Sequence, residues 1–173
     1  MMIRVLRFNT YLLLALTVSA GCVSDPAKRK PGKEDEASLR LHLEVSPDGS
    51  DGNAPVSIGR EHPFQLNIEK IAFLTEFQIE KASVVDALGG FSILIQFNKQ
   101  GTSLLEMHTT ANKGRHLAIA AEFGEVRWLA APLIKQRMAD GVLVFTPDAT
   151  RAEAERIVSG LNLVAEQVRK GKK

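Results

Sequence analysis

The order of hydrophobic and polar residues along the chain predicts strands over much of its length. Leu39, Leu41 and Leu43 alternate with polar residues, which is the period-two pattern of a half-buried strand. Gly89 and Gly90 separate two later apolar runs and predict the turn of a hairpin. The further runs that predict strands are 54–58, 64–69, 83–86, 91–97, 115–122, 126–131 and 142–145.

Two segments have the period of a helix instead. Leu104 and Leu105 belong to a stripe with spacings of three and four residues, which predicts a helix over 99–112. Thr150 and Glu153 have the spacing of a capping box before a long apolar stripe, which predicts a second helix. The pattern therefore predicts an α+β domain with a mostly antiparallel sheet of five or more strands and two helices packed on one face.

The first 22 residues have the layout of a secretory signal. Two arginines precede a short apolar run, and three small residues precede Cys22, the sole cysteine of the chain. The apolar run is shorter than the about 20 residues that a membrane-spanning helix needs. The segment resembles the lipobox of bacterial lipoproteins, although Ser19 stands where leucine is usual. An ordinary signal followed by a chance cysteine is the alternative.

The lipobox resemblance has implications for the processing of the chain and for its location in the cell. It implies cleavage before Cys22 and attachment of acyl chains, such as palmitate, to this residue. We then expect a lipoprotein in the bacterial cell envelope, anchored to a membrane and facing the periplasm. Val23, which follows the cysteine, favours the outer membrane over the inner one.

Composition completes the expected domain organisation. The segment 22–37 is polar and contains two prolines, which predicts a flexible tether between a signal peptide at 1–21 and a folded domain at 38–173. A single cysteine excludes a disulfide framework. Outside the signal the chain has 20 basic and 20 acidic residues, so it lacks the positive charge typical of nucleic-acid binding.

Several short motifs, in one order, resemble the SecD and SecDF protein-export subunits, which belong to the preprotein translocase. The motifs are Leu74-Thr75 with Ile79, Ala82 and Val84; Phe97-Asn98 with Gly101; Thr109, Asn112 and Gly114-Arg115; Leu117-Ala118-Ile119; Gly124-Glu125-Val126; Ala131-Pro132-Leu133-Ile134; and Thr150 with Glu153-Ala154. The resemblance covers about residues 64–165. It implies the head subdomain of the first periplasmic domain of that family, with a role in protein export. The membrane helices through which the family couples proton flow to export have no counterpart in this sequence, so we do not expect energy coupling.

The sequence offers little catalytic chemistry. Its four histidines never lie three or four positions apart, and its only thiol is at Cys22, so no metal-ligand spacing is present. Nucleophile elbows, phosphate-binding glycine loops and paired carboxylates on one helix face are also absent from the sequence. We therefore expect no enzyme activity, no cofactor and no metal, and we expect His108 at the rim of a core.

Trp128 is the single tryptophan, and its neighbours Arg127 and Leu129 complete a candidate contact site for a peptide or protein partner. Tryptophan and arginine are enriched where protein interfaces have most of their binding energy. The alternative is that Trp128 packs into the sheet with Phe123 as its cross-strand partner.

Three functions from different classes follow. The first is binding of unfolded or partner polypeptide in the cell envelope, as the resemblance implies. The second is a structural or adaptor lipoprotein that docks onto a larger membrane complex. The third is an enzyme, which would need a pocket with clustered polar groups.

Overall fold

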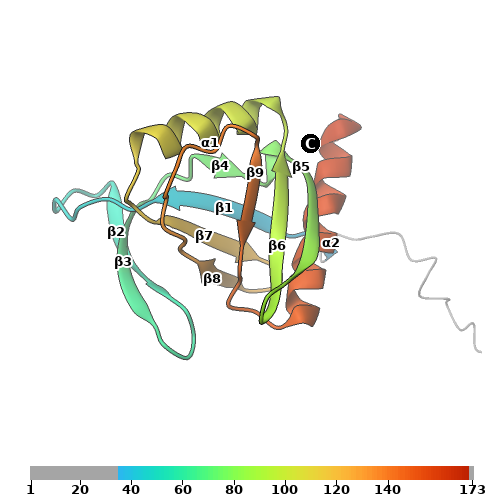
Figure 1. Cartoon of the computed structure of the whole chain (residues 1–173), viewed down its shortest axis with the longest axis horizontal. Helices are drawn as coiled ribbons and strands as arrows, with labels where there is room; N and C mark the ends of the chain where they lie inside the picture. The colour runs from blue at the N-terminus through green and yellow to red at the C-terminus, as the bar shows by residue number, and fades with distance from the viewer. Residues whose placement is uncertain (1–34, 172–173) are drawn as a thin grey trace, which may run out of the picture. The chain divides into compact units, whose positions relative to one another are not determined.

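The computed structural model describes residues 35–171, which form an α+β domain with antiparallel sheets (Figure 1). The strands form a four-stranded sheet, a three-stranded sheet and a two-stranded hairpin. In sheet order, these are β4 (Leu74–Thr75), β1 (Ser38–Leu43), β7 (Leu117–Glu122) and β8 (Val126–Ala130); β5 (Ile79–Ala87), β6 (Gly90–Phe97) and β9 (Val142–Phe145); and β2 (Asn53–Ile58) with β3 (Phe64–Glu69). The α+β class and the antiparallel pairing are confirmed.

The division into three sheets corrects the expectation of one sheet with five or more strands. A 3-10 turn, η3 (Glu76–Gln78), lies between β4 and β5 and changes the direction of the chain. The backbone N–H of Asn98 donates to Gln78 C=O at 2.8 Å, which fixes this corner. As a result β4 pairs with β1, whereas β5 pairs with β6.

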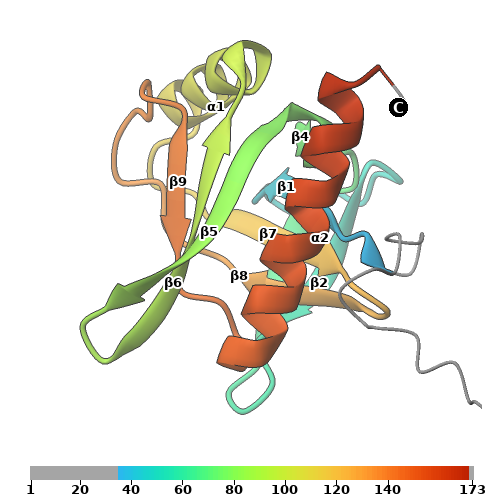
Figure 2. The same cartoon turned by 90° about the vertical axis from the view of Figure 1, so that its right-hand side faces the viewer.

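Both predicted helices are present and begin at polar caps. Helix α1 (Lys99–Ala111) begins at Asn98, whose side chain accepts a hydrogen bond from Gly101 N–H at 2.9 Å. Helix α2 (Arg151–Arg169) begins at the capping box of Thr150 and Glu153. Helix α2 lies along β5 and also contacts β1, whereas α1 contacts β4 and β6 (Figure 2). The two helices therefore lie mainly over different strands, although both contact β6.

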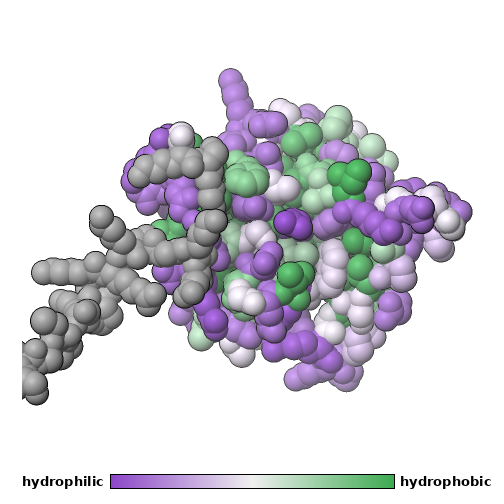
Figure 3. Space-filling view, turned by 180° about the vertical axis from the view of Figure 1, so that it is seen from behind, coloured by the Kyte–Doolittle hydropathy of each residue, from purple (hydrophilic) through white to green (hydrophobic). Residues whose placement is uncertain are grey.

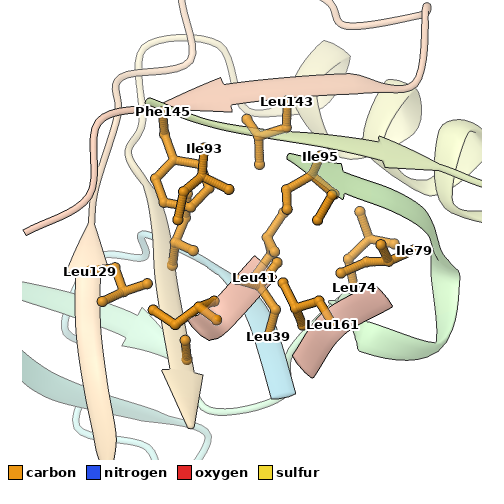
Figure 4. Close-up of a cluster of buried hydrophobic side chains, with 14 of the residues drawn as sticks. Leu39, Leu41, Leu74, Ile79, Ile93, Ile95, Leu129, Leu143, Phe145 and Leu161 are labelled. Carbon is orange, nitrogen blue, oxygen red and sulfur yellow. The ribbon is translucent and has the colours of Figure 1, made fainter. Parts of the chain in front are cut away.

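The main hydrophobic core lies between the four-stranded sheet, the three-stranded sheet and α2 (Figure 4). Ile93, Ile95 and Phe97 point into it from one face of β6, as their alternation predicts. Other fully buried members are Leu39, Leu41, Leu74, Leu105, Leu117, Ile119, Leu129, Ile134, Ile157 and Leu161.

A second, smaller core lies on the opposite face of the four-stranded sheet. There the β2–β3 hairpin places Ile58, Leu66 and Ile68 against Ala118 of β7, with Trp128 packed at the side. Strand β7 is therefore covered on both faces, which explains why its first five residues are all buried.

The folded domain begins before Ser38. Ala37 is buried, and the Glu36 carboxylate accepts a hydrogen bond from the Gln167 side chain at 2.8 Å. The end of the expected tether therefore packs against α2, where Gly160 leaves room for it. Cys22, the expected signal peptide and the rest of the expected tether lie outside the described residues. Between residues 35 and 171, no helix is both long and apolar enough to cross a membrane.

Candidate functional site: an open strand edge and two clefts

The outer edge of β9 presents free backbone groups. Strand β9 pairs with β6 so that Leu143 faces Ile95 and Phe145 faces Ile93. The backbone N–H of Phe97 donates to Gly141 C=O at 2.9 Å, which identifies these as the hydrogen-bonded pairs of the ladder. Since backbone groups alternate in direction along an antiparallel strand, the N–H and C=O of Val144 point away from β6. The described residues provide no partner for either group.

Three other strands are covered at one outward position each. On β5, the backbone N–H and C=O of Ala82 both bind the side-chain amide of Asn162 from α2, each at 2.9 Å. On β2, the same alternation places Pro55, which has no N–H, at an outward position. On β3, Asn67 C=O accepts the N–H of Val45 at 2.9 Å. Val144 has none of these three kinds of cover.

A groove of about 550 Å³ lies beside this open edge, and we call it the β9 groove. Its walls are β9 with the following loop, the end of β8 with the segment after it, and the tip of the β2–β3 hairpin. Val144 and Phe64 line the groove and are exposed apolar residues, at 51% and 44% of their surface. The other lining residues are Ile58, Gly59, His62, Ser92, Leu129, Ala130, Ala131, Pro132, Phe145, Thr146, Pro147 and Asp148.

A cluster of charges holds one end of the β9 groove together. Arg60, in the β2–β3 loop, lies 3.3 Å from the Asp148 carboxylate and 3.8 Å from that of Glu153. Arg127 reaches Glu153 from β8 at 2.8 Å and also donates to Asp148 C=O. The hydrogen bond from Thr150 N–H, aided by Arg127, lowers the pKa of Glu153 to about 2. The loop tip, β8 and the start of α2 are thus joined at one point.

The three candidate contact residues do not form one surface. Leu129 is 1% exposed and belongs to the main core, so it has no surface to offer a partner. The Arg127 side chain is 13% exposed and is occupied by its ion pairs. Trp128 points to the opposite face of the sheet and lies in the smaller core. The alternation of side chains along a strand is the sequence signal that separates Trp128 from its two neighbours.

Trp128 packs into the sheet, but its neighbours differ from those expected. Its cross-strand partner on β7 is Ala120, and its ring meets that of His42 edge-on at 5.3 Å between centroids. Phe123 lies on the other face, where the Arg127 guanidinium is 5.5 Å from its ring. Side chains alternate between the two faces of a strand, so Phe123 and Arg127 point to one face of the hairpin and Trp128 points to the other.

A second hollow, which we call the Trp128 cleft, has a volume of about 260 Å³ and lies between this face and the β2–β3 hairpin. It is lined by Ser38, Arg40, His42, Ala54, Val56, Ile68, Lys70, Ala120, Ala121, Glu122, Val126 and Trp128. Seen from the side opposite to Figure 1, hydrophobic residues form several patches between hydrophilic ones (Figure 3).

Three of the four histidines are held in structural contacts. His42 is buried, its Nδ1 lies 2.9 Å from Glu69 C=O, and burial lowers its pKa. His116 Nδ1 lies 2.7 Å from the Glu44 carboxylate. His108 packs on the ring of Phe73, with 4.2 Å between centroids, and burial lowers its pKa as well. In the part of the chain that the structure describes, no three acidic, histidine or cysteine side chains converge on a metal-sized site.

These features define the class as an antiparallel α+β domain with an exposed strand edge. The domain is similar to the solved structure of a membrane component SecDF that enhances protein export, with a TM-score of 0.54 and 19% identity over 73% of this chain and 62% of that one. It is also similar to SecDF in its super-membrane-facing form, with a TM-score of 0.52 and 20% identity over 73% of this chain and 18% of that one. The fold is therefore SecDF-like. No protein-family model and no curated protein matches the chain.

Proposed function

We propose that this chain is a non-catalytic polypeptide-binding lipoprotein whose SecDF head-like domain receives an extended segment along the open edge of β9. The observation behind the proposal is the contrast between two edges of one sheet. The Asn162 amide covers the edge of β5 at Ala82, whereas no described residue pairs with the outward backbone groups of Val144 on β9, which lies beside a groove. A peptide that adds a strand here would bind through its backbone, which tolerates many sequences.

The side chains around the groove suit the same ligand. Val144 and Phe64 are exposed apolar residues, and Pro132 and Ala131 extend the apolar wall. An extended segment that pairs with β9 would point alternate side chains toward this wall. Unfolded polypeptide meets both requirements, because it offers free backbone groups and exposed apolar side chains.

The proposed location in the cell follows from the sequence. Acylation at Cys22 would hold the domain at a membrane surface, since two or more acyl chains bind stably where one binds only marginally. The outer membrane is favoured, with the domain facing the periplasm. A link to protein export is supported by the SecDF-like fold and by the motif resemblance. Cys22→Ser should release the chain from the membrane fraction, and unchanged attachment would contradict the lipoprotein assignment.

The binding test uses a chain from Val23 onward and an extended apolar peptide, followed by amide chemical shifts. We expect Kd values between about micromolar and about millimolar, with shifts centred on Val142–Phe145. Val144→Pro removes the outward N–H without breaking the ladder to β6, so it should weaken binding strongly. Val144→Ile keeps the N–H and an apolar β-branched side chain, and it should bind like the parent.

Two outcomes would redirect the proposal. If Val144→Pro binds as well as the parent, or the shifts lie elsewhere, β9 is not the binding edge. If peptides do not bind at all and the membrane-anchored chain co-purifies with one folded partner, the adaptor function replaces polypeptide capture.

A further inference from the structure

The Trp128 cleft is a slot between two large side chains with a small one between them. Across the sheet, Ala120 faces Arg40 on β1 and Trp128 on β8. Two strand spacings place the backbones of β1 and β8 about 10 Å apart. Since the side chain of Ala120 is only a methyl group, the space above it is open between the aliphatic part of the Arg40 side chain and the Trp128 indole.

The size and walls of the cleft suit a small apolar group. Its volume is about 260 Å³. A dry cavity of about 150 Å³ is enough for benzene, so this cleft has room for a ligand of about ten non-hydrogen atoms. Ala54, Val56 and Ile68 of the β2–β3 hairpin form the wall opposite Ala120, and Val126 extends it.

The charges around the cleft are unevenly distributed and would orient a charged ligand. Arg40 and Lys70 lie at the rim, and Arg40 has no ion pair among residues 35–171. The Lys70 ammonium donates one hydrogen bond to Asp51 C=O at 2.7 Å and has two more hydrogens to give. Glu122 lies opposite Ser38, in the next cross-strand pair on the same face as that of Arg40 and Ala120. The Glu122 carboxylate repels a negative group of the ligand, whereas Arg40 and Lys70 attract it.

We propose that the Trp128 cleft binds an apolar carboxylate of about ten non-hydrogen atoms, the chemistry of a medium-chain fatty acid. The alkyl chain lies on Ala120 against the Trp128 indole, and the carboxylate meets Arg40 and Lys70. His42 stays neutral beside it, since burial lowers its pKa, and so adds little to the attraction. This site is separate from β9, and the inference does not depend on polypeptide binding there.

The test uses the full chain with Cys22→Ser and three probes of equal chain length: octanoate, octan-1-ol and octylamine, all below micelle-forming concentrations. The fluorescence of Trp128, the single tryptophan, reports binding directly. We expect octanoate to bind at least about threefold more tightly than octanol, and octylamine to bind most weakly. Equal affinities for the three probes would overturn the assignment of the carboxylate.

Two variants separate the charge from the slot. Arg40→Gln should weaken octanoate about three- to tenfold and leave octanol unchanged, whereas Arg137→Gln, an exposed arginine paired with Glu106, should change neither. Ala120→Leu fills the slot and should weaken all three probes, provided that its thermal melt shows a folded chain. Octanoate binding that is unaffected by Arg40→Gln, or no response of Trp128 fluorescence at about 10 mM octanoate, would refute the proposal.

Discussion

Gly160→Ala sets two physical effects against each other and tests where the folded domain begins. In the interior of a helix, alanine is more favourable than glycine by about 1 kcal/mol, so propensity alone predicts a more stable protein. A Cβ at this position, however, would lie 2.6 Å from the Ala37 nitrogen and 2.8 Å from both Ala37 Cβ and Asp35 C=O. Two of these three are backbone atoms, which cannot move aside as a flexible side chain does.

The steric effect should exceed the propensity effect. Overpacking a tight contact costs about 1–3 kcal/mol, and subtracting the gain of about 1 kcal/mol leaves a net loss of about 0–2 kcal/mol for Gly160→Ala. Urea unfolding followed by circular dichroism measures this difference in the free energy of unfolding. Ser159→Ala, at an exposed position of the same helix, is the matched control and should gain a few tenths of a kcal/mol.

A double variant and a clear contrary result complete the test. Ala37→Gly combined with Gly160→Ala removes the Cβ–Cβ clash but leaves the two backbone contacts, so it should recover only part of the lost stability. If Gly160→Ala is instead more stable than the parent by about 1 kcal/mol, propensity acts alone. Residues 35–37 are then not packed on α2, and the domain begins at Ser38 after all.

Three further predictions concern the capping box and β8. Thr150→Ala should lower the free energy of unfolding by about 0.5–2 kcal/mol and Thr146→Ala by less, and equal thermal shifts would contradict the assigned helix start. The pKa of Glu153 is lowered from 4.5 to about 2, so the stability contributed by its charge is complete above pH 4.5 and is lost as the pH falls toward 2. Glu153→Gln should therefore make the urea midpoint depend less on pH across that range. A pH dependence equal to that of the parent would argue against this role. Leu129→Ala should cost about 2–5 kcal/mol in urea unfolding, whereas a residue that served only as a surface contact would cost far less.

Local structure followed from the sequence wherever one physical signal dominated. The capping box at Thr150 and the alternation of Ile93, Ile95 and Phe97 each involve residues within one turn or one strand. Strand β5 is longer than its predicted span 83–86 because the adjacent polar residues Glu80 and Lys81 hide its beginning from a hydrophobicity pattern. Its edge is held by α2, a segment about 80 positions away in the sequence.

Strand pairing and the open edge did not follow from the sequence. Alternation shows that a segment is half-buried but does not say which strand it pairs with, so three sheets looked like one. The role of Asn162 was missed because a polar residue in a helical stripe is usually a solvated position. Pro55 offered a usable signal, since proline within a strand indicates an outward-facing edge position.

The shortness of β9 determines how a bound polypeptide would gain its affinity. Within the strand, Val144 offers an N–H and a C=O, while the N–H of Val142 already donates to the Asp140 carboxylate at 3.1 Å. With the C=O of Val142, three backbone groups are free, and at about 0.5–1.5 kcal/mol each they contribute about 1.5–4.5 kcal/mol. A dissociation constant of about 1 mM already requires about 4.1 kcal/mol, so backbone pairing alone gives millimolar binding at best.

Micromolar binding needs apolar side chains in the β9 groove, where burying about 100 Å² of apolar surface adds about 2.5 kcal/mol. A polypeptide bound as proposed could therefore have many sequences at the edge, and the groove would favour apolar ones.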